Sequence, residues 1–476
     1  MSDSAALHAA PGKPSAPKVS KKGIWSWMLF DWAAQPYHTL LVTFIFAGYF
    51  AAEVAPDPVT GQTWWSAMLT ISGLSLAVAA PILGAVADAS GPRKPWIALF
   101  SLIAILGACY LWFARPGEVD NALLVLIAFG VMLFGIEFAL VFANAVMPDL
   151  VPRDELGRLS GTGWALGYVG GVISLIIVLA LMVEASPGSG ATLVGVPPVA
   201  GLDEIPRGGE RASGPFTVLW YVVFALPFFL FTPDVARKAK VDGAVVQGLR
   251  SLKTTIVKLP ETPSLFAFMG SSMFYRDALN GLYTFGGIYA RGVLEWSVTQ
   301  LGVFGILAAI TGALGAFFGG RLDDAKGPRF VIKLSIIVLI VVCIGIVTTN
   351  RSTLLMIPIE PAPGPFALPD IMFYICGALI GAAGGALQAA SRTLMTDQAQ
   401  DGKMTEAFGL YALSGKATSF LAPAMIGLFT LASGSQQVGL SALIIIFIAG
   451  LILLRWVREH GDDVPPPAER PSGHLN

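Results

Sequence analysis

Five charged side chains fall inside long apolar stretches of the sequence: Asp31, Glu137, Arg276, Asp277 and Lys416. A charged group at the centre of a membrane helix costs about 2.5–3.5 kcal/mol on insertion scales, so such groups usually pair or face a wet cavity. Arg276 and Asp277 are neighbours and point about 100° apart on a helix, so each needs another partner. The chemistry available to these residues is the binding of a proton or an ionic solute within a membrane.

The apolar stretches that carry these charges dominate the composition. The chain has 476 residues, of which 55% are hydrophobic and 13% are charged, and its mean hydropathy is +0.70. A soluble domain has about a quarter of its residues charged, so we expect an all-α, multi-pass membrane protein. The net charge of −1 gives no field that would attract nucleic acid. The three cysteines, Cys109, Cys343 and Cys376, are too widely spaced to form a metal site, and no metal or cofactor is expected.

The number of apolar runs predicts the number of spans, because about 20 apolar residues cross a bilayer as one helix. Gly, Pro and polar residues separate the runs. We predict twelve helices, near residues 24–52, 64–87, 95–114, 121–147, 157–183, 216–233, 263–290, 298–320, 330–348, 369–395, 404–432 and 436–457.

The distribution of Lys and Arg agrees with this count if both termini are cytoplasmic. Cytoplasmic loops of membrane proteins are enriched in Lys and Arg. With twelve spans, all but seven of the 30 Lys and Arg residues fall in cytoplasmic segments. The exceptions are five in outer loops and two inside helices: Arg115, Arg207, Arg211, Arg291, Arg351, Arg276 and Lys416.

The connecting segments divide the chain into five parts. We expect a polar, disordered tail over 1–22, a six-helix half over 23–233, a linker over 234–262, a second six-helix half over 263–460 and a tail over 461–476. The Gly/Pro-rich segment 184–215 should form an irregular outer loop. The linker is basic with a short apolar periodicity, which favours a segment lying on the anionic inner leaflet; a regulatory partner site is the alternative.

A ten-residue motif occurs twice. Residues 84–93, GAVADASGPR, and residues 320–329, GRLDDAKGPR, both fit G-x-x-x-D-x-x-G-P-R and lie 236 positions apart. A looser repeat relates Asp31 and Tyr37 to Asp277 and Tyr283. Two halves repeated in the same orientation are typical of transporters that bind their substrate at the membrane midplane.

The repeated motif has a physical interpretation. Its first glycine, Gly84 or Gly320, lets two helices approach closely. Its aspartate can face the positive N-terminal end of a neighbouring helix, and its arginine can bind helix-end carbonyls or carboxylates. Lys94 would reinforce the first copy. The alternative is a tight loop with solvated charges. The motif residues are Gly84, Asp88, Gly91, Arg93, Lys94, Gly320, Asp324, Gly327 and Arg329.

The motif resembles the signature of the major facilitator superfamily. More narrowly, several stretches resemble the family of the autophagy-related vacuolar effluxer and its bacterial relatives. They are FDWAAQPYHTLLVTFIFAGYF (30–50), FANAVMPDLV (142–151), SGTGWALGYVGG (160–171), LQAASRTL (387–394), FGLYALSGKATSFLAP (408–423) and GSQQVG (434–439). The chain departs from the family at FYRD (274–277), because a neutral residue more often precedes that aspartate, and Arg276 could change the charge of the preferred substrate.

The resemblance implies a fold and a set of contacts. It implies two pseudo-symmetric six-helix halves, with the repeated motif acting as a cytoplasmic latch between them. Because the first and seventh helices face each other in this superfamily, we expect Asp31 to contact Arg276 and Asp277 to contact Lys416. Glu137 and Lys416 could instead be structural residues within one half.

The resemblance also implies which polar residues line the central cavity, since the first, fourth, seventh and tenth helices do so in this superfamily. Pro36 can free a backbone carbonyl near Asp31. Arg392 could alternatively snorkel to the interface. The expected substrate or proton site comprises Asp31, Gln35, Tyr37, Glu137, Asn144, Arg276, Asp277, Asn280, Tyr283, Gln388, Arg392 and Lys416.

These observations predict a secondary active transporter and not an enzyme, because no nucleophile–base pair emerges and no nucleotide-binding loop of the form G-x-x-x-x-G-K-[ST] is present. The presence of both charge signs favours a small polar or zwitterionic solute, and the resemblance implies amino-acid efflux by a monomer in a bacterial inner membrane. A buried carboxylate can take up and release a proton, so H⁺ is the expected coupling ion. The alternatives are an exporter of amphipathic drugs or natural products and a non-transporting membrane sensor.

Overall fold

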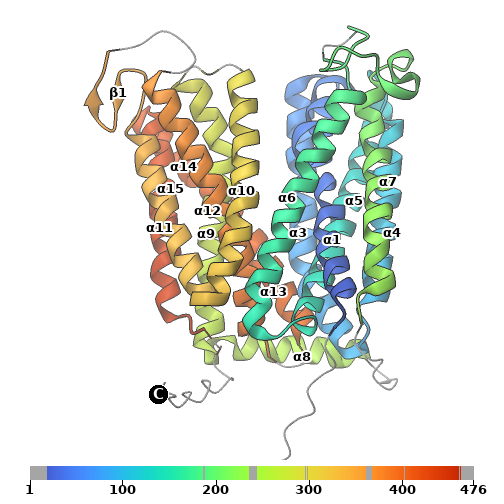
Figure 1. Cartoon of the computed structure of the whole chain (residues 1–476), viewed down its shortest axis with the longest axis vertical. Helices are drawn as coiled ribbons and strands as arrows, with labels where there is room; N and C mark the ends of the chain where they lie inside the picture. The colour runs from blue at the N-terminus through green and yellow to red at the C-terminus, as the bar shows by residue number, and fades with distance from the viewer. Residues whose placement is uncertain are drawn as a thin grey trace, which may run out of the picture.

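Two bundles of helices stand side by side, and a further helix lies across one end of both (Figure 1). The computed structural model describes residues 19–185, 188–234, 244–294, 296, 298–360, 367–400, 403–459 and 461. Residues 1–18 and 462–476, which hold most of the two expected tails, lie outside the described residues. We call the end with α8 (Ala244–Lys258) the α8 end. The opposite end carries β1 (Thr353–Leu354) and β2 (Ile357–Pro358), and we call it the hairpin end.

The N-terminal half contains six membrane spans. The first is a helical stretch formed by α1 (Lys21–Pro36), η1 (Tyr37–Phe44), α2 (Phe46–Tyr49) and η2 (Phe50–Val54). The others are α3 (Pro58–Ser90), α4 (Lys94–Tyr110) with η3 (Leu111–Phe113), α5 (Val119–Val146), α6 (Leu156–Leu181) and α7 (Gly208–Phe231). Short 3-10 turns lie between spans at η4 (Met147–Asp149), η5 (Arg153–Glu155) and η6 (Val199–Glu204).

The C-terminal half follows α8 and the turn η7 (Leu259–Glu261). It contains α9 (Pro263–Gly292), α10 (Val298–Lys326), α11 (Pro328–Val347), α12 (Leu368–Gln398), α13 (Met404–Ala417), α14 (Leu421–Ser433) and α15 (Gln436–Leu453) with η8 (Leu454–Trp456). Within the described chain, ten helical segments have the length and hydropathy to cross a bilayer. The less apolar α9 and the broken pair α13–α14 complete twelve, which confirms the predicted two-half architecture.

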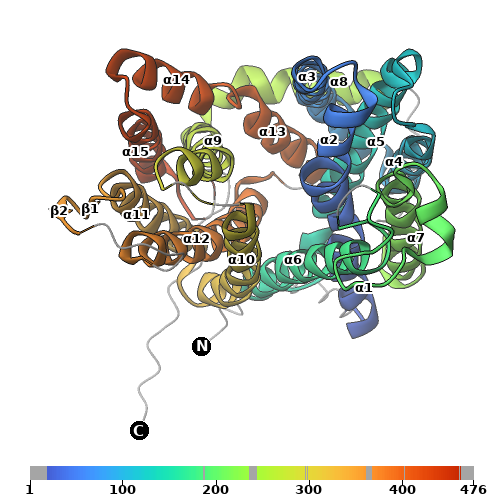
Figure 2. The same cartoon turned by 90° about the horizontal axis from the view of Figure 1, so that it is seen from above.

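Each half has its own apolar core, and α5 contributes to both. One cluster of buried side chains lies within the N-terminal half, and a second lies mainly within the C-terminal half but includes Ala85 of α3. Val141 and Ala145 of α5 belong to the second cluster, so this face of α5 meets the opposite half. Seen from above, α6 and α10 lie next to each other where the two halves meet, as do α3 and α13 (Figure 2).

The first span differs from the single regular helix expected over 24–52. It begins at Lys21, where the hydroxyl of Ser20 caps the helix by accepting a hydrogen bond from Gly23 N. After Pro36 the backbone widens into the π-helix η1. Proline lacks an N–H and displaces the carbonyl one turn earlier, which favours this change of hydrogen-bond pattern. Lys21 and Lys22 therefore belong to the helix and not to the tail.

The eleventh span is also broken, although one helix was expected over 404–432. The chain turns at Thr418–Phe420, where Leu421 N donates to Thr418 O at 2.8 Å, and α14 then begins. Pro423 occupies the first turn of α14, a position that proline favours because its missing N–H would have no helical partner. That proline was the sequence signal for a new helix start.

Two connectors contain more regular structure than expected. The segment 184–215 was expected to be irregular throughout, but α7 begins at Gly208 and the turn η6 precedes it. The loop between α11 and α12 carries the short antiparallel hairpin β1–β2, whereas the other elements of the described chain are helices. In the linker, α8 is a helix that buries Leu252 and exposes Arg250, Lys253 and Lys258.

Candidate functional site

Arg392 of α12 joins the two halves through an ion pair in which the arginine is buried and the aspartate is partly buried. Its Nη1 donates to Asp31 Oδ2 of α1 at 2.9 Å and to Asn144 Oδ1 of α5 at 3.0 Å. Its Nε donates to Ser160 Oγ of α6 at 2.9 Å, and its Nη2 donates to Ser160 O at 2.7 Å. Arg392 is only 4% exposed, so it does not snorkel to an interface. Three residues predicted from sequence, Asp31, Asn144 and Arg392, therefore meet at one point.

Aromatic rings enclose the guanidinium of Arg392. Its centre lies 5.0 Å from the ring centroid of Trp27 and 5.7 Å from that of Trp164. The indole N–H of Trp27 donates to Ala143 O at 2.8 Å, which fixes that ring. Cations over indole faces are stabilised most where water is excluded. Sequence reasoning did not single out Ser160, Trp27 or Trp164, although Ser160 and Trp164 lie within the stretch SGTGWALGYVGG.

Gly163 of α6 makes room for the ion pair. A Cβ atom there would lie 2.7 Å from Asp31 Oδ2 and 3.2 Å from Arg392 Nη2. We expect Gly163→Ala to separate Asp31 from Arg392 and to lower solute flux by about tenfold or more, which corresponds to about 1.4 kcal/mol. The measurement is flux in reconstituted vesicles.

Gly167 provides the matched control, one turn further along α6. A Cβ there would lie 3.5 Å from Asp31 O and from Gln35 Oε1, which is an ordinary contact. Gly167→Ala should therefore retain flux close to that of the unmodified protein. Equal loss in both variants would mean that α6 tolerates no added methyl group and that the ion pair is not the cause.

The expected contact between Asp31 and Arg276 is wrong. The Nη1 of Arg276 donates to Tyr411 O of α13 at 3.0 Å, and its guanidinium lies 4.2 Å from the centroid of the Tyr411 ring. It packs over Gly415, where a Cβ would lie 2.5 Å from Arg276 Cζ. Arg276 therefore binds a helix of its own half, because α13 comes closer to this face of α9 than α1 does.

Asp277 has a structural partner that the sequence did not reveal. Its Oδ2 accepts a hydrogen bond from Ala422 N at 2.7 Å, at the start of α14, and the side chain is buried. A carboxylate at a helix N-terminus satisfies a free N–H and interacts favourably with the helix dipole. The expected Asp277–Lys416 contact involves the side chain of Lys416, which lies outside the described part of the chain.

Tyr37 does not face the other half, contrary to expectation. It is fully buried in the core of the N-terminal half, edge-on to Tyr221 of α7 with ring centroids 5.4 Å apart. Asp31 and Gln35 are four residues apart and share a helix face, whereas Tyr37 is two residues beyond Gln35 and points to the opposite side. The looser repeat of Asp31 with Tyr37 and Asp277 with Tyr283 therefore does not describe equivalent positions.

The remaining predicted residues lie on four helices. Gln35 lies one turn beyond Asp31, Gln388 lies one turn before Arg392, and Glu137 lies two turns before Asn144. On α9, Asn280 is exposed, and Tyr283 is 43% exposed.

The side chain of Tyr283 crosses between the halves. It packs over Gly384 of α12, and its ring lies near that of Tyr168 of α6. The spacing of Arg276, Asn280 and Tyr283 places them on one face of α9.

The first copy of the repeated motif binds the opposite half at the α8 end. Asp88 of α3 accepts hydrogen bonds from Thr405 N at 3.2 Å and from Glu406 N at 2.8 Å, in the first turn of α13. A Cβ on Gly84 would lie 2.5 Å from Thr405 O, so only glycine permits this approach. Arg93 Nε donates to Thr405 Oγ1 at 3.1 Å. We call this set the α3–α13 contact.

The second copy makes the reciprocal contact. Asp324 of α10 accepts from Arg158 N at 2.9 Å near the start of α6, and from Arg158 Nε at 3.3 Å. Gly320 packs directly against Gly157 O and Gly161. We call this set the α10–α6 contact. In both copies a carboxylate of one half accepts from the N-terminal turn of a helix in the other, as the physical interpretation of the motif predicted.

The other motif residues act within a half. Gly91 and Gly327 adopt φ values of +99° and +82°, which a side chain would strain. Lys94 Nζ donates to Phe229 O of α7 at 2.9 Å, and Arg329 Nη2 donates to Arg455 O at 3.1 Å, so neither reinforces a contact between halves.

Arg93 has a stronger partner than the motif alone suggested. It pairs with Asp149 at 2.6 Å, and its Nη2 lies 3.8 Å from Asp88 Oδ1. Asp149 precedes α6 within the same half, and sequence reasoning did not single it out.

Comparison with known proteins identifies the family to which the chain belongs. A family model described as "Vacuole effluxer Atg22 like" matches residues 59–462. The chain is 24% identical over 437 residues to an uncharacterized MFS-type transporter, YxiO, of Bacillus subtilis, covering 91% of this chain and 94% of that protein. It is 24% identical over 309 residues to autophagy-related protein 22 of Coccidioides immitis, covering 62% of this chain and 47% of that protein. The chain thus spans about half the length of that fungal relative.

Solved structures show the same fold at low sequence identity. The transporter FucP in its outward conformation superposes with a TM-score of 0.67 at 13% identity, covering 91% of this chain and 97% of FucP. The proton:xylose symporter XylE superposes with a TM-score of 0.66 at 10% identity, covering 92% and 96%. With its two six-helix halves, its reciprocal motif contacts and a family match over most of its length, the chain is a major facilitator superfamily transporter that belongs to the Atg22-like vacuole effluxer family.

Proposed function

We propose that the protein exports a small zwitterionic solute resembling an amino acid, by proton-coupled alternating access, and that it works as a monomer. The observation that carries this proposal is the largely buried Asp31–Arg392 pair, which spans both halves. A zwitterion presents a carboxylate that can bind Arg392 and an ammonium that can bind Asp31. Such a solute replaces both partners of the pair, whereas a solute of one charge leaves one of them buried without a counterion.

Proton coupling follows from the same pair in this proposal. Protonation of the Asp31 carboxylate removes the negative charge that binds the ammonium of the solute, so the proton and the solute compete for Asp31. Arg392 binds the carboxylate of the solute, while Asn144 and Ser160 keep the guanidinium in position. A proton that enters from outside therefore expels the solute, and release of that proton to the cytoplasm restores the Asp31 carboxylate for the next solute. Asp31 is thereby the proton carrier, and Arg392 is the anion site.

Alternating access requires the halves to separate at the α8 end. In the present structure the α3–α13 and α10–α6 contacts hold this end together, and we assign both contacts the role of a latch. The excess of Lys and Arg in the segments at the α8 end supports a cytoplasmic location of this end and of both termini. The name of the matched family supports efflux, and the bacterial relative supports an inner-membrane location.

The test begins with a search for the solute. Purified full-length protein is heated with amino acids, dipeptides, organic acids and lipophilic cations, and the melting temperature is recorded. We expect a zwitterionic compound to raise it, since a ligand at 100 times its Kd adds about 2.7 kcal/mol to the stability of the folded state. Flux of that compound in vesicles should then change several-fold when a pH gradient is imposed, and Asp31→Asn should abolish the response to pH. Stabilisation by lipophilic cations alone would instead identify an exporter of amphipathic compounds.

A further inference from the structure

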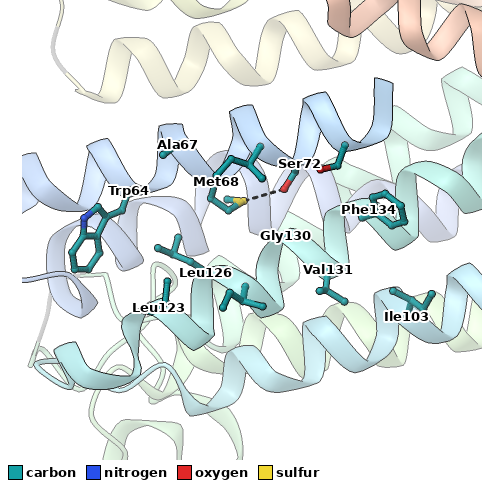
Figure 3. Close-up of a pocket in the computed structure, with 13 residues that line it drawn as sticks. Trp64, Ala67, Met68, Ser72, Ile103, Leu123, Leu126, Gly130, Val131 and Phe134 are labelled. Carbon is teal, nitrogen blue, oxygen red and sulfur yellow. Dashed lines mark hydrogen bonds between the residues drawn. The ribbon is translucent and has the colours of Figure 1, made fainter. Parts of the chain in front are cut away.

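A groove opens on the side of the N-terminal half, away from the ion pair. It lies between α3 and α5, with Ile103 of α4 at one end, and has a volume of about 820 Å³. Figure 3 shows the groove lengthwise: Trp64 and Leu123 lie toward one end, and Phe134 and Ile103 lie toward the other. No residue of the proposed transport site lines it.

The walls of the groove are almost entirely apolar. None of the thirteen lining side chains is charged, and the hydroxyls are those of Ser72 and Ser75. Ser72 is buried and directs its hydroxyl toward Met68 Sδ at 3.7 Å, so it is turned into the wall. A charged or strongly polar ligand would lose its hydration here without gaining partners. The chemistry of the lining fits a hydrocarbon.

The rim of the groove faces the lipid. Ile71 and Leu123 are each 65% exposed, and Ile127 is 53% exposed, on helices that are long and apolar enough to cross the bilayer. Contiguous exposed apolar surface of this kind is covered by lipid in a membrane protein, because the hydrophobic effect keeps water away from it.

The length of the groove along α5 matches the thickness of one leaflet of the bilayer. Leu123 and Phe134 are eleven residues apart on α5, which corresponds to about 16 Å along a helix. The hydrocarbon core of a bilayer is about 30 Å thick, so the groove runs from one interface to the midplane. Trp64 marks the interfacial end, where tryptophan is enriched. The polar residues Asp120 and Asn121 lie beside that end, just before Leu123.

A glycine leaves the space open. A Cβ on Gly130 of α5 would lie 3.1 Å from Ser72 Oγ and 3.8 Å from Met68 Cγ, so any side chain there would project into the groove. An empty space of this size would forfeit the dispersion contacts of its whole lining. We infer that the groove holds one hydrocarbon chain of a phospholipid from the leaflet at the hairpin end, and that this lipid is retained as part of the folded transporter.

Native mass spectrometry of the full-length protein tests the inference. The protein is reconstituted with phosphatidylethanolamine, extracted in mild detergent, and the bound phospholipids are counted. Ala67→Trp fills the groove, and Leu74→Trp is the control, because Leu74 lies on the same helix, is 60% exposed and is not part of the lining. We expect Ala67→Trp to retain one phospholipid fewer than the unmodified protein and Leu74→Trp. Equal counts in all three proteins would overturn the inference.

A second measurement needs no variant, so it holds even if Ala67→Trp folds poorly. Phosphatidylethanolamine with a photoreactive diazirine in its acyl chain is crosslinked to the unmodified protein, and the adducts are mapped. Labelling should be several-fold higher on segments 67–75 and 123–134 than around Val341 of α11, which is 61% exposed but outside the groove. Even labelling would contradict a retained chain. Displacement of the lipid by the transported solute would contradict it as well, because the groove would then be a path for cargo.

Discussion

Replacing Arg392 with methionine is expected to abolish solute flux and to lower the melting temperature of the purified protein. The substitution leaves Asp31 as a partly buried carboxylate without its counterion, and it removes a donor from Asn144 Oδ1 and two donors from Ser160. Removing one partner of a buried ion pair costs about 3–5 kcal/mol. The same change removes the proposed anion site. Flux in vesicles and thermal unfolding in detergent measure the two effects separately.

A double-mutant cycle distinguishes this pairing from the one expected from sequence. The effects of Asp31→Asn and Arg392→Met on the free energy of unfolding should be non-additive by about 1–3 kcal/mol, because each substitution removes the same interaction. Asp31→Asn and Arg276→Met should be additive, since Arg276 binds Tyr411 in its own half. Coupling between positions 31 and 276, with additivity between 31 and 392, would refute the arrangement. Arg392→Lys serves as the control for charge, because it keeps the cation but loses the planar fork that binds Asp31, Asn144 and Ser160 together.

The second large effect is expected for Asp88→Asn, which should open the α8 end without unfolding the protein. Asp88 accepts two backbone N–H groups of α13. An amide can accept one of them but adds a donor where a second acceptor is needed. Hydrogen bonds to charged groups contribute about 1.5–3 kcal/mol, so the ratio of closed to open protein should fall by about 10- to 100-fold. Transport should fall too, because the closed state at this end becomes rare.

Cysteine accessibility measures this shift. Ala407 of α13 is buried beside the contact, so a cysteine placed there in a variant without Cys109, Cys343 and Cys376 reports opening by its rate of alkylation. Asp234→Asn is the matched control. Asp234 also accepts from two N–H groups at a helix start, those of Arg93 and Lys94, but it lies in the same half as they do. Faster alkylation in Asp88→Asn alone is the expected result; similar rates in both variants would show that the α3–α13 contact does not hold the halves together.

The sequence by itself determined the number of spans and the kind of contact that the repeated motif makes. A helix in lipid satisfies its backbone hydrogen bonds within one segment, so apolar length is enough to find it. The motif could be interpreted because its parts are local: Gly84 and Asp88 are one turn apart, and so are Gly320 and Asp324, so each glycine and its carboxylate share a helix face. Each half of the chain therefore presents a glycine and a carboxylate on one helix face to the other half.

Only the tertiary structure decided which charges meet. Asp31 and Arg392 are 361 positions apart, and four helices must pack before Asn144 and Ser160 join them. Asp277 found its partner because α13 and α14 are separated by a turn, which exposes the N–H of Ala422. Tyr37 faces the core because it lies two residues beyond Gln35, and side chains two residues apart on a helix point to nearly opposite sides. Composition reveals that a charge in an apolar helix needs a partner, but the rotation and packing of whole helices determine which partner is within reach.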